Sequence, residues 1–258
     1  MLLALLFVAC GRTEVLGGLR SSSGTPDTQR QPSGLVIVSQ LRNTPFDDTR
    51  PFVLAAFASQ PFSFSGDRAE FDAPGCTIGK LGAIDGGVFL PAGTLGITTG
   101  TWSKTFDAQA DRRYVYREDS TTAVEPPVVA SFAGSTVPAF SATLPAVDDL
   151  GVSIVGFTCA SFSCSPIARD RPLVLTWKPG RGDVVLRIAT TSVGELICRF
   201  PGAPGTATVA VAELQRLPAG DAVVEAGSFS SGQTTVATYR VALRVYRQSI
   251  DEGFAQLR

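Results

Sequence analysis

From Gly34 onwards the sequence consists of short apolar segments separated by clusters of Gly, Pro, Asp and Ser. Within these segments apolar residues often recur at every second position, as Val184, Leu186 and Ile188 do. A period of two places alternate side chains on the same face of a β-strand, whereas an amphipathic helix repeats about every 3.6 residues. Short strands with frequent turn residues are typical of sandwiches and barrels. The pattern therefore predicts an all-β fold.

The length of this part of the chain bears on the number of domains. Roughly 225 residues follow Ser33, a length that suits two sandwich-like domains or one large one. The segment "PAVDDL" (Pro145–Leu150) interrupts the strand pattern and is the best candidate boundary. We expect two antiparallel β-sandwich-like domains at residues 34–146 and 147–250, followed by a tail at 251–258.

Two local features in the second half have recognisable turn and helix signals. The segment "KPGRG" (Lys178–Gly182) separates two β-like runs and predicts a hairpin turn. Its Arg-Gly-Asp tripeptide, residues 181–183, resembles an integrin-binding motif, but Gly and Asp are also what tight turns use, which is the favoured explanation. The segment Val211–Gly220 predicts one short helix that ends at Pro218.

The start of the chain bears on its location. Leu2–Ala9 are all apolar, and this run is too short to cross a bilayer, which needs about 20 apolar residues. Its length matches the apolar part of a signal peptide. The segment Phe7–Cys10 resembles a bacterial lipobox, whose cysteine is acylated and becomes the new N-terminus, although Phe7 stands where Leu is usual and no Lys or Arg precedes the run. We therefore expect a signal peptide at residues 1–9 and lipidation at Cys10, with ordinary secretion as the alternative.

A lipidated Cys10 implies a membrane partner and a location. Each buried acyl CH₂ contributes about 0.8 kcal/mol, so several chains on one cysteine hold firmly without a membrane-spanning helix. Residues 10–33 are rich in Gly, Ser, Thr, Pro and Gln, and this composition predicts a flexible tether. In lipoproteins an Asp after the cysteine favours inner-membrane retention, so Gly11 favours the outer membrane. The expected location is the bacterial cell envelope, with secretion as the alternative.

The four remaining cysteines, Cys76, Cys159, Cys164 and Cys198, agree with export, since oxidising compartments preserve disulfides. An extended strand would hold Cys159 and Cys164 too far apart for a bond, so that pairing requires a loop between them. We favour this local bond, which leaves Cys76 with Cys198, while a bond from Cys198 to Cys159 or Cys164 remains the rival. No C-x-x-C pair occurs, so zinc binding is not expected.

Both predicted halves contain elements of a family resemblance. The matching elements are Val137–Phe140, Thr176-Trp177, the alternating strand Val184–Ile188 and Cys198–Phe200. In this order they resemble a group of uncharacterised bacterial exported lipoproteins with β-sandwich-like domains, mainly over residues 135–218. The resemblance implies a fold and a location, and it supplies no activity.

Composition excludes several classes of function. The chain has no histidine, which rules out a Ser-His-Asp triad, Cys-His catalysis and His-ligated metals. It has 22 basic and 23 acidic residues and no long run of either sign, so the usual electrostatic basis for nucleic-acid binding is missing. No catalytic motif is present. We expect a protein that is not an enzyme, without cofactor or metal, with a structural or interaction role and an envelope protein or polysaccharide as partner.

Two alternatives rest on particular side chains. Tyr114 and Tyr116 lie two apart on one predicted strand, and Trp102 lies on another. Such aromatic side chains could stack on sugar rings as a carbohydrate-binding module, although an aromatic core cluster is the favoured explanation. A carboxylate-based hydrolase is the third hypothesis, since acidic partners need only meet in space. The acidic clusters Asp67/Glu70/Asp72 and Asp148/Asp149 could help to bind calcium, although solvated loop carboxylates are the favoured explanation.

Overall fold

The computed structural model describes residues 32–43, 48–59, 75–79, 88–117, 122–160, 163–190 and 194–258. These belong to one compact unit, Gln31–Arg258. The expected signal peptide, Cys10 and nearly all of the expected tether lie outside the described residues, as do Asp67, Glu70 and Asp72. The predictions made for them therefore remain predictions.

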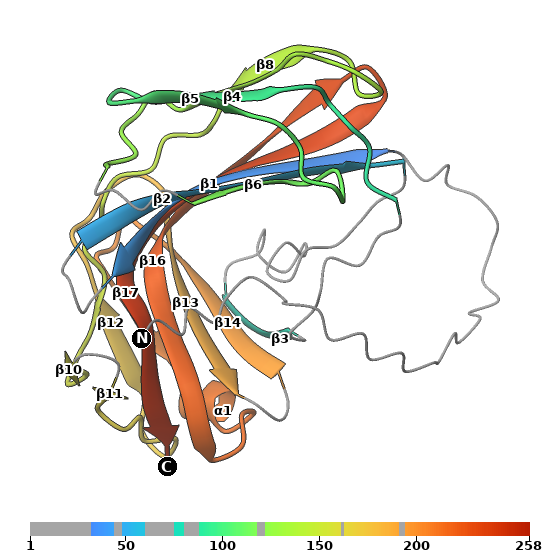
Figure 1. Cartoon of the computed structure of the whole chain (residues 1–258). Coiled ribbons are helices and arrows are strands. Elements are labelled where there is room, and N and C mark those ends of the chain that lie inside the picture. Colours follow the sequence, from blue (N-terminus) through green and yellow to red (C-terminus); the bar gives the residue numbers. More distant parts are fainter. Residues whose placement is uncertain are drawn as a thin grey trace, which may run out of the picture. The chain divides into compact units, whose positions relative to one another are not determined.

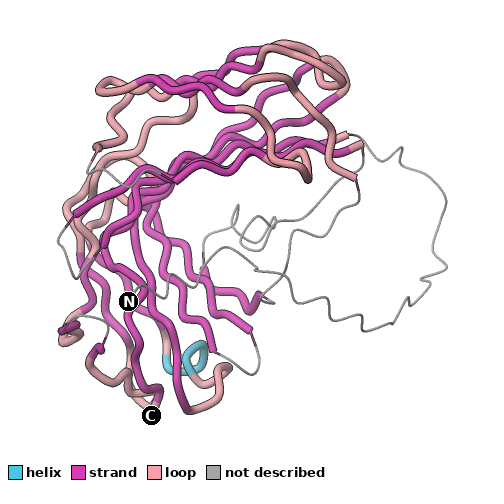
Figure 2. Tube along the Cα trace, in the orientation of Figure 1, coloured by secondary structure: helices cyan, strands magenta, loops and turns pink. Residues whose placement is uncertain are grey.

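The regular structure of the described residues consists of strands and one short helix, joined by loops (Figures 1 and 2). The strands and helix are, in chain order, β1 Ser33–Asn43, β2 Asp48–Ala58, β3 Gly75–Gly79, β4 Leu95–Thr98, β5 Ser103–Phe106, β6 Tyr114–Arg117, β7 Val129–Phe132, β8 Phe140–Thr143, β9 Ser153–Ile154, β10 Cys159–Ala160, β11 Ser163–Cys164, β12 Leu173–Thr176, β13 Asp183–Thr190, β14 Gly194–Pro201, β15 Thr206–Val209, α1 Val211–Leu214, β16 Gly220–Val236 and β17 Tyr239–Leu257. The predicted all-β class is confirmed, and α1 lies within the segment predicted to be helical.

Three sheets organise these strands. The largest has ten strands in the order β3-β14-β13-β16-β17-β1-β2-β6, with β10 and β11 attached beside β17. A four-stranded sheet has the order β5-β4-β7-β8, and a three-stranded sheet the order β15-β12-β9. Most neighbours are antiparallel, as expected, but β1 and β11 each run parallel to β17. Parallel neighbours cannot be joined by a tight turn, so these pairings were not visible as hairpins in the sequence.

Two hydrophobic cores lie between these sheets. The first core joins the four-stranded sheet to β1, β2, β6 and the start of β17, and its larger members include Val38, Phe57, Leu95, Ile97, Tyr114, Phe132 and Leu243. The second core joins the three-stranded sheet and α1 to β13, β14, β16 and the end of β17, and its larger members include Leu150, Leu175, Trp177, Leu186, Ile188, Leu196 and Leu214. Burial of Val184, Leu186 and Ile188 confirms the core face predicted from their period of two.

The boundary predicted near residue 146 falls where the chain passes from the first core to the second. Val147 belongs to the first core and Leu150 to the second. The long strands β16 and β17 nevertheless run through both regions, and the ten-stranded sheet draws strands from each predicted half. The two sandwich-like regions therefore share one continuous sheet.

The predicted hairpin at Lys178–Gly182 is wrong. β12 pairs with β15 and β9, whereas β13 pairs with β14 and β16, so the strands on either side belong to different sheets. Trp177 is 7% exposed, and its indole N–H donates to the carbonyl of Gly202 at 2.6 Å. The segment crosses from one layer of the sandwich to the other. Gly and Pro serve both kinds of connection, so composition alone could not distinguish them.

The end of the chain is also different from the expectation. Residues 251–258 were expected to form a tail, but β17 continues to Leu257, which pairs with Gly220 of β16. Ala255 and Leu257 are buried in the second core. The apolar residues there are few and widely spaced in the sequence, and pairing with β16 supplies the hydrogen bonds that make them a strand.

Candidate functional site

Tyr114, the first of the predicted sugar-binding aromatics, is a core residue. It is fully buried in β6, and its hydroxyl accepts from the Ala92 N–H at 2.9 Å and donates to the Gly93 carbonyl at 2.6 Å. Burial raises the pKa of this phenol, because the phenolate would lose its hydration. The ring lies edge-on to Phe132, with centroids 5.6 Å apart. A ring enclosed in this way cannot stack on a sugar.

The other two predicted aromatics, Trp102 and Tyr116, come together in an aromatic cluster that also contains Phe106 and Lys104. Tyr116 stacks on Phe106 with centroids 5.2 Å apart and an interplanar angle of 12°, and it lies 6.5 Å from Trp102. The Lys104 ammonium donates to the Tyr116 hydroxyl at 2.6 Å and lies 5.2 Å from the ring centre. All three rings are partly buried against the first core. The structure thus supports the aromatic core cluster, with one partly exposed edge.

Cys76 and Cys198 form one disulfide, as favoured from the sequence. The two residues lie directly opposite each other on β3 and β14, 122 residues apart in the chain. Cys198 is fully buried in the second core, and Cys76 packs against the same core. This bond fastens the edge strand β3, which comes from the first predicted half, to a strand of the second.

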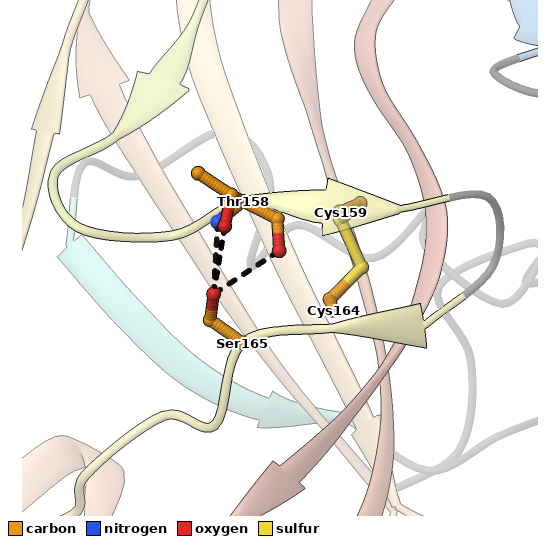
Figure 3. The surroundings of a disulfide bond; sticks show 4 residues. All are labelled: Thr158, Cys159, Cys164 and Ser165. Carbon is orange, nitrogen blue, oxygen red and sulfur yellow. Dashed lines mark hydrogen bonds between the residues drawn. A yellow bond between two sulfur atoms is a disulfide. The ribbon is translucent and has the colours of Figure 1, made fainter.

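Cys159 and Cys164 form the second disulfide, also as favoured. They lie opposite each other in the short hairpin of β10 and β11, which supplies the loop that the pairing required. Figure 3 shows that Thr158 and Ser165 continue the hairpin beyond the disulfide. The Ser165 N–H donates to the Thr158 carbonyl at 2.8 Å, and the Thr158 N–H donates to the Ser165 hydroxyl at 3.2 Å.

A row of polar side chains crosses the face of the ten-stranded sheet opposite the second core. The carboxylates Glu195 and Glu225 are buried, at 1% and 5% exposure. Arg187 lies between them and donates to both, with its Nη1 at 3.3 Å from Glu225. Gln248 donates to Glu225 at 3.2 Å and accepts from the backbone N–H of Arg42 at 2.7 Å. The row links five adjacent strands, from β14 to β1.

The same face carries a small third cluster beside the polar row. Val185, Ile197 and Phe229 are buried there. The guanidinium groups of Arg199 and Arg244 lie 5.3 and 5.7 Å from the Phe229 ring centre. Cations over an aromatic face are attracted by the ring quadrupole, so these arginines contribute to packing.

Sequence reasoning missed this polar row. The only signal was a charged residue in the middle of each of three apolar strands, "DVVLRIAT", "GELICRF" and "DAVVEAGSF". The row does not give a hydrolytic site, because Arg187 occupies the space between the two carboxylates where a glycosidic substrate would have to lie. Its chemistry is that of a buried ion-pair network in which Arg187 binds both carboxylates.

The Arg-Gly-Asp tripeptide is held by internal ion pairs. Arg181 makes a two-point contact with Asp148, including an Nη2–Oδ1 distance of 2.8 Å. Hydrogen bonds from Arg181 hold the pKa of the Asp148 carboxyl below its usual range. Asp183 accepts from Nε of Arg199 at 2.7 Å. Both charged ends of the tripeptide therefore stabilise the crossing between layers, and the segment is not the tight turn that the sequence favoured.

Other kinds of site are not apparent in the part of the chain that the structure describes. There, no three His, Cys, Asp or Glu side chains gather in a way that could hold a metal ion. No helix in those ranges is long and apolar enough to span a membrane. A hollow lined by Val124, Leu144, Val245 and Arg247, among others, has a volume of about 10 Å³, enough for roughly one water molecule.

Comparison with known proteins gives no family. Neither a protein-family model nor a curated protein matches the chain. The crystal structure of a tetra-tandem repeat in the extending region of a large adhesion protein matches 85% of this chain and 50% of its own, at 13% identity and a TM-score of 0.21. A structure from work on host cell surface retention of a 1.5-MDa bacterial ice-binding adhesin matches 85% of this chain and 64% of its own, at 14% identity and a TM-score of 0.20. The chain spans half of the first and less than two thirds of the second, and TM-scores this low assign neither family nor function.

Proposed function

We propose that this chain is a non-catalytic structural or interaction protein of the bacterial cell envelope, held to a membrane by lipid on Cys10. The observation that carries the proposal is that Cys76, Cys159, Cys164 and Cys198 are all joined in two disulfides within an all-β body. Such bonds form and persist in secreted, periplasmic and surface proteins and are rare in the reducing cytosol.

The state of the charged groups supports a non-catalytic role. A catalytic acid or base must reach the substrate with its proton or lone pair. Glu195 and Glu225 are instead both bound to Arg187, and Asp148 is bound to Arg181. The Arg187 pairs link β13 to the neighbouring strands β14 and β16, and the Arg181 pair stabilises the segment that crosses from one layer to the other.

The anchor is supported by the sequence "FVAC", which ends the apolar run at Cys10. Two or more acyl chains on this residue give firm attachment, at about 0.8 kcal/mol for each buried CH₂. With Gly11 in the next position, we assign the protein to the outer membrane.

Replacing Cys10 by Ser tests the anchor. The variant should move from the membrane fraction to the soluble fraction and lose incorporation of a fatty-acid label, because its acylation site is gone. Gly11→Asp is the matched control: it should keep the label and shift from the outer to the inner membrane. A labelled or membrane-bound Cys10→Ser variant would refute lipidation at this residue.

Carbohydrate binding is the second candidate, and it rests on the partly exposed edge of the aromatic cluster. Trp102 and Tyr116 keep some exposure, and the buried indole N–H of Trp102 has no acceptor among the described residues. A sugar ring binds by stacking on the flat apolar surface of an aromatic ring, and both of these side chains have such a ring.

Binding of envelope polysaccharides to the compact unit Gln31–Arg258 tests this second candidate. If the edge of the cluster is the site, Trp102→Ala should abolish binding while circular dichroism stays unchanged. Lys178→Ala, on the crossing segment after β12, serves as the control and should bind normally. Absence of binding to any polysaccharide leaves an envelope protein as the partner.

A further inference from the structure

The Cys159–Cys164 disulfide lies directly on the backbone of Gly253 in β17. A Cβ atom built on Gly253 would lie 2.1 Å from Sγ of Cys164 and 3.0 Å from Sγ of Cys159. Gly253 is not among the residues with positive φ, so its backbone conformation does not require glycine. The two sulfur atoms therefore occupy the space in which any other residue would place its side chain.

Few other contacts hold the hairpin that carries this disulfide. Ala160 and Ser163 are exposed, and both cysteines are only half-buried. One pairing, Ser163 with Phe254, joins the hairpin to β17. The disulfide joins the two strands of the hairpin to each other. Its sulfurs lie on β17, and Cys164 also packs against the second core.

The chain on the C-terminal side of the hairpin is attached independently. Ile167 is 2% exposed, and its N–H donates to the Gln256 carbonyl at 2.8 Å. The Arg258 N–H in turn donates to the Ile167 carbonyl at 3.0 Å. An opening of the hairpin would therefore stop before Ile167 and leave the second core intact.

The other disulfide has one partly exposed residue, Cys76, and one buried residue, Cys198. Cys198 is fully buried, and its partner Cys76 lies on a strand hydrogen-bonded along its whole length to β14. Thiol–disulfide exchange needs access of a thiolate to one sulfur in line with the bond. Both residues of the hairpin disulfide are partly exposed, whereas in the other bond only Cys76 is, and β3 is paired with β14 along its length. We therefore expect exchange to be faster at the hairpin.

We propose that Cys159–Cys164 is a redox-sensitive clamp that keeps the two strands of the β10–β11 hairpin together over Gly253 and opens on reduction by a dithiol. A dithiol thiolate attacks one sulfur, forms a mixed disulfide and releases the other cysteine as a thiolate. The second thiol of the reductant then displaces the protein sulfur. Two electrons pass from the dithiol, which becomes a cyclic disulfide, and each cysteine ends as a thiol. The freed hairpin uncovers the edge of β17 around Gly253 and Phe254.

Titration of the purified full chain with dithiothreitol, followed by alkylation and peptide mass spectrometry, tests the clamp. Cys159 and Cys164 should be alkylated at concentrations that leave Cys76–Cys198 intact. Hydrogen exchange should then increase at residues 158–165 and 253–255 and stay unchanged at 183–190. Reduction of Cys76–Cys198 at equal or lower concentration, or unchanged exchange in the hairpin after its reduction, would overturn the proposal.

Gly253→Ala tests the contact itself, with Gly232→Ala as the matched control. Gly232 also lies in a long strand, but a Cβ atom added there would meet only Pro145, whose nearest atoms would lie 3.7 Å away. Gly253→Ala should shift the thiol–disulfide equilibrium of Cys159 and Cys164 at least tenfold towards the thiols, which is about 30 mV for two electrons. Gly232→Ala should shift it less than about twofold, which is below about 10 mV on the same scale.

A Cys159→Ser/Cys164→Ser background completes the test and remains informative if Gly253→Ala folds poorly. Without the bond both side chains can rotate away, so Gly253→Ala should cost little stability there. The double serine variant alone should also show the increased exchange at residues 158–165. Equal cost of Gly253→Ala in both backgrounds would show that the alanine disturbs β17 by another route and would refute the clamp.

Discussion

The two sandwich-like regions of this protein share a sheet but are stabilised differently. In the first core Phe57, Phe132 and Phe140 form a continuous set of ring contacts, with centroids 5.0 Å apart for Phe57–Phe132 and 4.8 Å for Phe132–Phe140. The second core has both disulfides in or beside it. Ring packing in one region thus takes the place of covalent bonds in the other.

The same kind of sandwich can therefore be stabilised either by aromatic packing or by disulfides. Large aromatic side chains bury much area and prefer edge-to-face or offset contacts, which the first core shows. A disulfide mainly restricts the unfolded chain, and the restriction grows with the length of the closed loop. The first region should therefore be insensitive to reductants and the second sensitive.

The largest effect is expected from removing Cys76–Cys198. Since the bond closes a loop of 122 residues, Cys76→Ser/Cys198→Ser should lower the free energy of unfolding by about 4–5 kcal/mol on the chain-entropy model. Urea denaturation under oxidising conditions measures this change. Cys159→Ser/Cys164→Ser, which opens a loop with a separation of 5, should cost only about 2 kcal/mol on the same model. A larger loss for Cys159→Ser/Cys164→Ser than for Cys76→Ser/Cys198→Ser would contradict the chain-entropy account.

A somewhat smaller effect is expected from truncating the first core. Phe132→Ala removes a ring that is 3% exposed and touches three other aromatic rings, so it should cost about 3–4 kcal/mol. The loss should be the same with and without dithiothreitol, because the first core contains no disulfide among its described residues. Denaturation curves under both conditions check this. A loss that depends strongly on reductant would mean that the two regions do not behave separately.

The smallest effect is expected at the passage between the cores, where Asp148 binds Arg181. The folded pKa of Asp148 lies below its ordinary value of 3.8, so the pair contributes stability above that pH and loses it as the pH falls through the folded pKa. Asp148→Asn should therefore destabilise the protein slightly at neutral pH and not in strong acid, below the folded pKa. Thermal unfolding under both conditions measures this, with Asp149→Asn as the control. An equal effect under both conditions would exclude the ion pair as its cause.

Much of the local structure could be predicted from the sequence. The period of two at Val184, Leu186 and Ile188 identified a strand and its core face, since pleating places alternate side chains together. Cysteine number and spacing favoured the observed pairing, in which a loop brings Cys159 and Cys164 together and Cys76 is left for Cys198, but a bond from Cys198 to Cys159 or Cys164 remained a rival. Local geometry was sufficient for the strand and its core face.

The partners of each strand were decided only by the tertiary structure. Lys178–Gly182 connects two layers, and residues 251–257 extend β17, because strand pairing depends on hydrogen bonds between distant segments. The site predictions show the same limit. Tyr114 and Tyr116 share a face, as their spacing required, but only the opposing sheet made that face the interior.

The sequence by itself determined the all-β class and the alternating core faces, since both follow from short-range geometry, and it favoured the two observed disulfides over a rival pairing. The tertiary structure alone decided that two cores share one sheet, that Arg187 lies between Glu195 and Glu225, and that a disulfide rests on Gly253. These arrangements join residues far apart in the chain. They are stabilised by side-chain packing and strand pairing between distant segments, which a local sequence pattern does not predict.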